Sequence, residues 1–194
     1  VQATSKHSYC VETKFCPGTS QTCALSLRGP YEASKGNNVG TANVTFENYV
    51  LSFTMELAGD WSITGSYQSV LHIGDENGHR MPGIWFNPNE NSLYVNQDAC
   101  CGASTDASFG FTAGSTYDIK VVLDKNKLDV YVDGVKLATS TGSSTAAREY
   151  AAVYVGDPWY DAAKVTLSDI CLTEIAVCDE NTADRALTVT RCTT

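Results

Sequence analysis

Hydrophobic and polar positions alternate most regularly between residues 117 and 139 (YDIKVVLDKNKLDVYVDGVKLAT). The odd positions of 117–124 are apolar, and so are the even positions of 128–132. A period of two is typical of a β-strand, because successive side chains point to opposite faces. The first two runs are joined by Lys125-Asn126, and Asp133-Gly134 is a turn dipeptide. The pattern therefore predicts a hairpin that leads into a third strand.

Shorter apolar runs recur on both sides of this hairpin and are separated by Gly, Pro, Asn and Asp turn signals. The predicted strands are 22–27, 44–57, 69–73, 83–86, 92–95, 150–155, 164–175 and 186–191. No convincing amphipathic helix is present, and the best helical stretch, 145–148, is very short. About ten or eleven short strands with such turns predict an all-β sandwich or barrel.

Three stretches are predicted to be irregular, and one strand has an irregular rhythm. Residues 1–30 are cysteine-rich, 35–41 (KGNNVGT) are rich in turn formers, and 97–106 contain a polar loop. Within 164–175 the apolar positions change parity, from Val165 and Leu167 to Ile170 and Leu172. A parity change inside a strand predicts a bulge or burial of both faces.

The cysteine count adds a constraint on the compartment. The chain contains eight cysteines, namely Cys10, Cys16, Cys23, Cys100, Cys101, Cys171, Cys178 and Cys192. An even number at this density predicts disulfides and an oxidising compartment, and no C-x-x-C pair supports a zinc site. The connectivity stays open. The adjacent Cys100 and Cys101 are expected to bond to two different partners, with a strained vicinal disulfide as the alternative.

Charge and processing signals point in the same direction. The net charge of −9 and the lack of a basic run argue against nucleic acid and anionic membranes as partners. No apolar run approaches the roughly 20 residues of a membrane-spanning helix. The chain starts at Val1 without a leader-like segment, so we expect a signal peptide to have been removed. Asn43 heads a glycosylation sequon. Together these features predict a secreted, soluble protein.

Three stretches resemble a known superfamily when they are taken in order. Residues 69–95 contain a strand that ends in His-Ile-Gly, followed by a polar turn and the motif Arg-x-Pro-x-Ile-Trp. Residues 117–137 contain two strands that end at Val-Asp-Gly. Residues 153–172 (VYVGDPWYDAAKVTLSDICL) resemble the closing pair of strands. They are similar to the concanavalin A-like lectin/glucanase superfamily, especially its laminin G-like and pentraxin-like branches. The resemblance implies a jelly-roll β-sandwich of two antiparallel sheets.

This resemblance sets the expected domain organisation. Residues 36–176 are expected to form the concanavalin A-like sandwich. Residues 1–35 are expected to form a cysteine-rich N-terminal arm, and residues 177–194 a C-terminal extension. The two extensions are expected to be tied by disulfides.

Catalysis is weighed first among the candidate functions. Glycoside hydrolysis needs two carboxylates about 5 to 9 Å apart on one side of the substrate. Asp129 and Asp133 share one strand face, but Asp133 is the turn residue of a hairpin. No G-x-S-x-G motif supports a serine hydrolase. The sequence therefore predicts no enzymatic activity and no catalytic residue.

A calcium site is the second candidate. Lectin and laminin G-like proteins often hold Ca²⁺ in loops, and Asp75 and Asn77 place two oxygen side chains before Gly78. Asp157 and Asp161 are a second candidate pair. The alternative is that these residues only form turns, which is the commoner role of Asp and Asn in such loops.

Aromatic residues in loops are the third candidate. Trp61 and Tyr67 lie in one predicted loop, and Trp159 and Tyr160 lie in another. An exposed Trp or Tyr presents an apolar face and a polar tip, which suits a carbohydrate. Trp61 is expected to be the most exposed of the four, and a packing role is the alternative for Trp159. Trp85 and His72, in contrast, are expected in the core.

Two functions follow from these features. The first is a secreted, lectin-like module that binds a glycan or an extracellular matrix protein. The alternative is a structural subunit of an extracellular filament, coat or adhesion assembly. In that case the C-terminal strand would add to a neighbour's sheet, or a cysteine would cross-link copies of the chain.

Overall fold

The computed structural model describes residues 10–15, 23–42, 48–75, 79–97, 103–124, 126–142, 151–175 and 187–192, with 10–15 and 187–192 described by their backbone alone. The chain divides into two compact units, Thr22–Ile175 and the pair Val1–Gln21 with Ala176–Thr194. All regular structure in the described residues is β-strand, which confirms the predicted all-β class. None of these residues forms a helix that could span a membrane.

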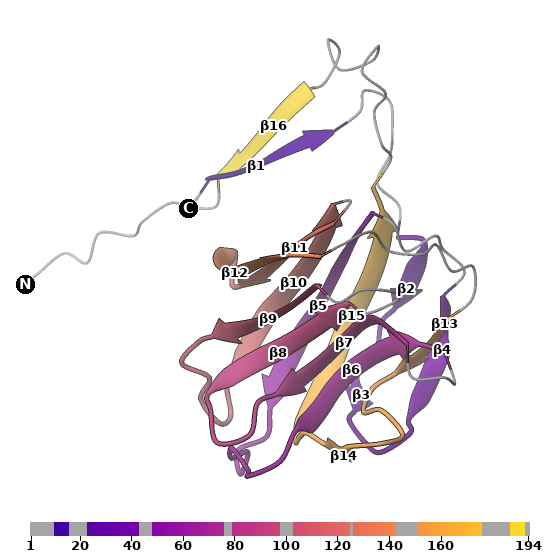
Figure 1. The fold of residues 1–194 in the computed structure, drawn as a ribbon, viewed down its shortest axis with the longest axis vertical. Helices are drawn as coiled ribbons and strands as arrows, with labels where there is room; N and C mark the ends of the chain where they lie inside the picture. Colours follow the sequence, from indigo (N-terminus) through magenta and orange to yellow (C-terminus); the bar gives the residue numbers. More distant parts are fainter. Residues whose placement is uncertain are drawn as a thin grey trace, which may run out of the picture. The chain divides into compact units, whose positions relative to one another are not determined.

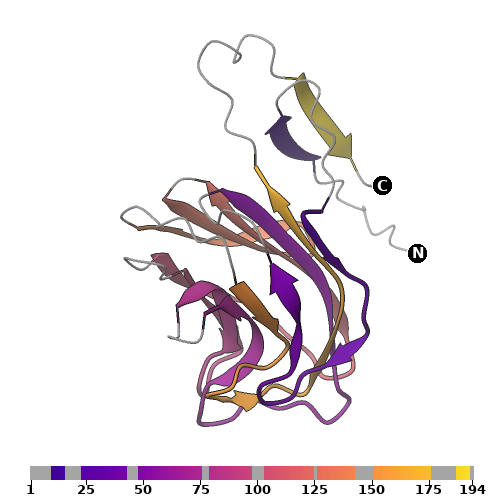
Figure 2. The same ribbon diagram turned by 90° about the vertical axis from the view of Figure 1, so that its right-hand side faces the viewer.

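The larger unit is a sandwich of two sheets (Figures 1 and 2). In the first sheet the spatial order is β12 (Val135–Thr141), β11 (Lys127–Val132), β10 (Thr116–Asp124), β5 (Tyr49–Leu57), β15 (Val165–Glu174) and β2 (Leu25–Leu27), and β3 (Tyr31–Glu32) also pairs with β15. In the second sheet the order is β4 (Asn38–Ala42), β13 (Ala151–Tyr154), β6 (Gln68–Gly74), β7 (Arg80–Phe86), β8 (Ser92–Gln97) and β9 (Ala103–Ser108), and β14 (Asp161–Ala162) also pairs with β6. All pairs are antiparallel except β14 with β6, so the predicted sandwich of two antiparallel sheets is confirmed.

The core lies between the sheets and follows the alternation of the sequence. Strand β5 buries every second residue: Tyr49, Leu51, Phe53, Met55 and Leu57. The facing strands of the second sheet contribute large apolar side chains in the same way. A hydrogen bond from the hydroxyl of Tyr49 to Oε1 of Gln97 in β8 (2.7 Å) crosses this apolar layer. Burial raises the pKa of the Tyr49 hydroxyl well above its usual range, so it remains a donor at neutral pH.

The predicted hairpin is present and has the expected turn. Strands β10 and β11 pair with Asp124 opposite Lys127, and β11 pairs with β12 across Asp133-Gly134. Both Asp133 and Gly134 have positive φ (49° and 77°). Positive φ at both central residues matches the right-handed twist of the flanking strands. This explains why an Asp-Gly dipeptide stands at that position.

The parity change in the last strand of the sandwich is a bulge. The register between β15 and β5 shifts between Ser168 and Cys171, and Asp169 has φ of 50°. The bulge turns Ile170 back to the core, on the same side as Leu167. The predicted irregularity is therefore confirmed, and the reading in which both faces are buried is not needed.

Three predicted irregular stretches contain strands that the sequence did not indicate. Strand β4 begins within the predicted loop 35–41, β9 begins within 97–106, and β1 (Cys10–Phe15) lies within 1–30. Both β4 and β9 are edge strands with few apolar residues. An edge strand needs only one hydrogen-bonded neighbour and buries little, so the alternation that marks a strand is weak there. The helical candidate 145–148 lies outside the described residues.

The smaller unit contains a two-stranded antiparallel sheet of β1 and β16 (Leu187–Cys192). Strand β16 confirms the predicted strand 186–191, with both ends shifted by one residue toward the C-terminus. In the larger unit, β2 and β3 fall within 1–35, the stretch predicted as an N-terminal arm, and they pair with β15.

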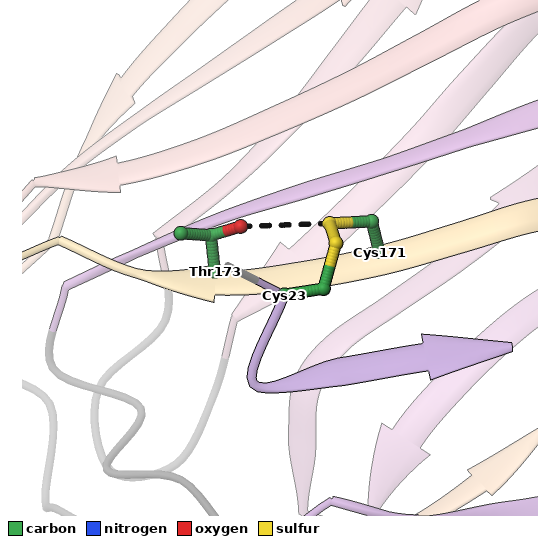
Figure 3. Close-up of a disulfide and its surroundings, with 3 residues drawn as sticks. All are labelled: Cys23, Cys171 and Thr173. Carbon is green, nitrogen blue, oxygen red and sulfur yellow. Dashed lines mark hydrogen bonds between the residues drawn. A yellow bond between two sulfur atoms is a disulfide. The ribbon is translucent and has the colours of Figure 1, made fainter. Parts of the chain in front are cut away.

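A disulfide fixes the start of the larger unit to its last strand. Cys23, two residues before β2, is bonded to Cys171 in β15, with a Cα–Cα distance of 5.4 Å (Figure 3). The hydroxyl of Thr173 lies 3.5 Å from the Cys171 sulfur. Two of the eight predicted disulfide cysteines are thus paired. Cys10 and Cys192 lie in β1 and β16, and Cys16, Cys100, Cys101 and Cys178 lie outside the described residues.

We expect replacement of both Cys23 and Cys171 by Ser to lower the free energy of unfolding by about 2–4 kcal/mol, because this disulfide closes a long loop in the unfolded chain. Urea denaturation monitored by tryptophan fluorescence would measure the change. Ser26→Ala is the matched control, since Ser26 is exposed in β2 opposite Cys171, and it should change stability by less than about 0.5 kcal/mol. Equal midpoints for the double variant and the wild type would contradict the expected role.

The carboxyl groups considered as a catalytic pair are both engaged within the first sheet. Asp129 accepts hydrogen bonds from Lys136 Nζ (2.8 Å) and from the Thr139 hydroxyl (2.6 Å), and Lys127 Nζ lies at 3.2 Å. Asp133 accepts the backbone N–H of Asp118 (2.8 Å). Both residues thus stabilise the β10–β12 region.

The hydrogen bonds of Asp129 predict that the stability of the protein depends on pH. Burial alone would raise the pKa of this carboxyl, but its hydrogen bonds from Lys136, Thr139 and Lys127 outweigh burial and lower it. Because the folded pKa lies below the unfolded value, the stabilisation is present above about pH 4 and is lost as the pH falls through the folded pKa. Asp129→Asn should therefore weaken the fold at pH 7 by about 1–3 kcal/mol and flatten the loss of stability below pH 4. The free energy of unfolding of both proteins would be measured between pH 2.5 and 7. If it changed with pH equally in both, this expectation would be contradicted.

Candidate functional site

The outward face of the second sheet carries a layer of aromatic rings. Trp85 in β7 is directly opposite Tyr94 in β8, and their ring centroids are 6.1 Å apart. Directly opposite residues of an antiparallel pair lie on the same face. Ile84 and Phe86, the neighbours of Trp85 in the chain, are buried in the core on the other face. The sheet therefore separates an apolar core from an aromatic outer layer.

A glycine provides the space in which the Trp85 ring lies. A Cβ atom at Gly83 would overlap the indole of Trp85. The ring can therefore lie over residue 83 of its own strand only because that residue has no side chain. This arrangement accounts for the Gly-Ile-Trp sequence of β7.

Next to this ring lies a pocket of about 210 Å³. It is lined by Tyr67, Arg80, Trp85, Tyr94 and Tyr160. The ring of Tyr67 is 5.7 Å from that of Tyr94 and 5.8 Å from that of Tyr160, and the Tyr160 ring is 6.1 Å from that of Trp85. The volume is below the roughly 300–1,000 Å³ of sites for drug-sized ligands. A pocket of this size suits one small ring or a terminal group of a larger ligand.

The charged groups at the pocket are the Arg80 guanidinium, which lines it, and the carboxyl groups of Asp106 and Glu90, which lie near Tyr67. The guanidinium of Arg80 lies 5.3 Å from the centre of the Trp85 ring, within the range of a cation–π contact. Desolvation raises the pKa of the Tyr67 hydroxyl, and the negative potential of Tyr94 and Asp106 raises it further. Tyr67 therefore keeps its proton and can donate a hydrogen bond at neutral pH.

The buried carboxyl group of Asp157 fixes the geometry of this site. Its Oδ2 accepts the indole N–H of Trp85 (2.6 Å), and its Oδ1 accepts the backbone N–H groups of Trp159 (2.9 Å) and Tyr160 (2.7 Å). The backbone N–H of Asp157 in turn donates to the hydroxyl of Ser69 in β6 (2.9 Å). One side chain thus sets both the plane of Trp85 and the path of the loop that carries Tyr160.

A second group of rings continues the aromatic layer beside the pocket. His72 is fully buried, and its ring lies 5.1 Å from Trp159, 6.1 Å from Trp85 and 6.2 Å from Tyr154. Trp159 remains 46% exposed and Tyr160 38% exposed. These two are the large aromatic side chains that the described surface presents most openly.

The structure brings together two of the four aromatic residues predicted for carbohydrate binding and places a third beside them. Tyr67 and Tyr160 line the pocket, and Trp159 lies in the adjoining ring layer. The predicted exposure of Trp61 is wrong. This ring is only 8% exposed and packs 4.9 Å from Phe86, because the loop before β6 folds back onto the core.

Sequence reasoning missed Trp85, Tyr94 and Arg80 as site residues. The sequence predicts Trp85 in the core, and it is indeed 98% buried, but its ring also lines the pocket. The signal that identifies it is the pairing of an aromatic residue in β7 with one in β8, and this pairing requires the register of the two strands.

Two of the residues predicted as calcium ligands, Asp75 and Asp157, accept hydrogen bonds from other groups. Both carboxyl oxygens of Asp75 lie within 2.9 Å of His79 Nδ1. Asp157 accepts three hydrogen bonds, as described above, and Asp161 is exposed in β14. Within the described ranges no group of three His, Cys, Asp or Glu side chains could hold a metal ion. Asn77 and the sequon residue Asn43 lie outside the described residues.

A larger groove lies on the outer face of the first sheet but has a different chemistry. Its volume is about 360 Å³, and polar residues of β5, β10 and the β15 bulge line it, including Ser52, Thr54, Asp118, Lys120 and Asp169. Its one aromatic lining residue, Phe53, is buried in the core. We regard the aromatic pocket as the candidate site, because there rigid rings and a cation converge on one small space.

Comparisons with known proteins identify the fold. No protein-family model and no curated protein sequence matches the chain. Among solved structures, a Trypanosoma rangeli sialidase in complex with sialic acid matches with a TM-score of 0.51 and 17% identity, over 69% of this chain and 22% of the sialidase chain. The botulinum neurotoxin type G receptor-binding domain matches with a TM-score of 0.54 and 9% identity, over 78% of this chain and 41% of its own.

A carbohydrate-binding module of Bacillus subtilis, CBM66, matches with a TM-score of 0.49 and 8% identity, over 80% of this chain and 96% of the module. This chain spans less than a quarter of the length of the sialidase. At such low identities, the two matches with TM-scores above 0.5 show only that the chain shares a β-sandwich fold with these proteins.

We expect Asp157→Asn to destabilise the protein by about 2–3 kcal/mol. The amide group cannot accept from Trp85 and from the two backbone N–H groups at the same time, so one buried donor is left facing another donor. Urea denaturation would measure the loss, and the tryptophan emission of the folded variant should shift to longer wavelength as the loop opens. Asp161→Asn is the control, because it removes an exposed carboxyl four residues away. Unchanged stability and emission in Asp157→Asn would contradict the assigned role.

Proposed function

We propose that the chain is a carbohydrate-binding module and that a sugar ring binds in the aromatic pocket. The observation that carries the proposal is the pocket itself. Three tyrosines, one tryptophan and one arginine surround a space of about 210 Å³ on an open sheet face. Aromatic rings offer flat apolar faces to the C–H surface of a sugar, and the Tyr hydroxyls and the Arg80 guanidinium offer hydrogen bonds to its oxygens.

The rigidity of the site supports this proposal. A flat ring binds a sugar well only if it is held in place beforehand, because ordering a side chain on binding costs about 0.5–1.5 kcal/mol. Trp85 is held by Asp157 and by its position over Gly83. The backbone of Tyr160 is held by Asp157, and its ring packs against those of Tyr67 and Trp85. The site therefore enters binding with little remaining freedom at two of its walls.

The comparisons support the proposal through the fold. The sialidase that contains a similar sandwich was solved with bound sialic acid, and the neurotoxin domain binds a receptor. Fold alone does not specify a ligand. The proposal rests on the pocket, with the fold as a compatible scaffold.

The proposal includes a location and a mode of action. The Cys23–Cys171 disulfide supports an oxidising compartment, so we place the protein outside the cell or in its secretory route, with a glycan or a glycosylated extracellular protein as partner. We propose binding without turnover. None of the five described lining residues is a carboxylic acid, whereas glycoside hydrolysis generally needs two. An oligomeric or filamentous assembly is the alternative function, and the experiment below includes a measurement that would reveal it.

A glycan array followed by calorimetry on the best ligand tests the proposal. We expect Tyr160→Ala and Tyr67→Ala to weaken binding at least tenfold each, because each removes one wall of the pocket, and Trp159→Ala to have a smaller effect. Tyr131→Ala is the matched control, since it removes a tyrosine from the first sheet. Addition of EDTA should leave the affinity unchanged, because none of the five lining residues is an ordinary calcium ligand.

Several results would overturn the proposal. They are no binding across the array with or without calcium, equal loss of affinity in Tyr131→Ala and Tyr160→Ala, or cleavage of the bound glycan. Sedimentation velocity on the same sample distinguishes the alternative function. A concentration-dependent series of larger species, together with no glycan binding, would favour the structural assembly.

A further inference from the structure

We propose that Cys10 and Cys192 form a disulfide that closes the two-stranded sheet of the smaller unit. Strands β1 and β16 pair antiparallel over six positions, and the last of these positions places Cys10 directly opposite Cys192. This inference is independent of the function proposed above. It concerns how the two ends of the described chain are held together.

The register supplies the geometry that such a bond requires. Directly opposite residues of an antiparallel pair lie on the same face, with Cα atoms about 4.5–5.5 Å apart. A disulfide requires a Cα–Cα distance of about 4.4–6.8 Å. The Cys23–Cys171 bond of the same chain has 5.4 Å, within both ranges. A slip of one position would separate the two cysteines onto opposite faces, so the observed register is the one that permits the bond.

The energetics of the unit also call for a covalent link. An isolated pair of strands is marginally stable in water, because it buries little apolar surface. Here the two strands lie at opposite ends of the sequence, so their pairing also closes a very long loop. In the described residues each strand of the unit pairs only with the other. A disulfide at the end of the ladder offsets the loop entropy in the unfolded chain, and the effect grows with loop length.

The chemistry is a simple thiol–disulfide exchange. One cysteine thiolate attacks the disulfide of an oxidised thiol–disulfide oxidoreductase and forms a mixed disulfide, and the second cysteine then displaces the reduced oxidoreductase. Cys10 and Cys192 together lose two protons and two electrons, and the oxidoreductase disulfide becomes a dithiol. The bond lies within one chain, so these two cysteines are not available to cross-link neighbouring copies.

The sequence makes this pairing directly measurable. Trypsin cuts after Lys6, Lys14 and Arg191, so Cys10 lies alone in the peptide 7–14 and Cys192 lies alone in 192–194. The full chain is produced in an oxidising secretory route, treated with N-ethylmaleimide in its native state, and digested without reduction. Mass spectrometry should find 7–14 linked to 192–194 in the monomer, and the linked species should disappear on reduction. The Cys23–Cys171 bond is the internal control: peptides 15–28 and 165–185 each hold two cysteines, so fragmentation of the linked pair should place this bond between Cys23 and Cys171.

A variant provides a second readout. Cys10→Ser should release one thiol that N-ethylmaleimide labels in 192–194, whereas the wild type should show no label there. The proposal is overturned if Cys10 or Cys192 of the native wild type is alkylated, if either is linked to a different cysteine, or if the 7–14 and 192–194 pair occurs only in a disulfide-linked dimer.

Discussion

The buried carboxyl group of Asp157 is the constraint on which the outer face of the second sheet depends. It lies in the loop after β13 and accepts the indole N–H of Trp85 from β7 and two backbone N–H groups from its own loop. Burial of a carboxyl group is costly unless its lone pairs are satisfied, and here each oxygen has at least one donor. The same bonds that satisfy the acid hold the aromatic rings in place. Stability and the shape of the site are therefore linked through one side chain.

One face of the second sheet forms part of the hydrophobic core, and the other face carries the candidate site. Toward the first sheet, Ile84, Phe86, Leu93 and Val95 fill the core, and the Tyr49–Gln97 hydrogen bond joins the layers. Away from it, the alternate residues of the same strands form the aromatic layer. The period of two thus lets short strands build the hydrophobic core and the candidate site at once. The site is placed on rigid strands, with only Tyr67 and Tyr160 outside them.

The fold was largely predictable from the sequence, whereas the site was predictable only in part. Regular alternation identified β5, β10 and β11, and a change of parity identified the bulge at Asp169. The edge strands β4 and β9 were missed, because strands that bury few apolar residues leave little pattern. For the site, loop position indicated Tyr67 and Tyr160. It failed for Trp61, whose loop folds onto the core, and for Trp85, whose role depends on its register with Tyr94 and on the long-range contact with Asp157.

The most direct test of this account is a two-dimensional ¹H–¹⁵N NMR titration of the isotope-labelled chain with the glycan that binds best. The indole N–H of Trp85 reports on one wall of the pocket and the backbone N–H of Tyr160 on another, while the backbone N–H groups of Asp118 and Lys120 report on the polar groove of the first sheet. We predict that the first two resonances shift in step with saturation and that the last two stay in place. Shifts confined to the groove, with Trp85 and Tyr160 unmoved, would contradict the assignment of the site.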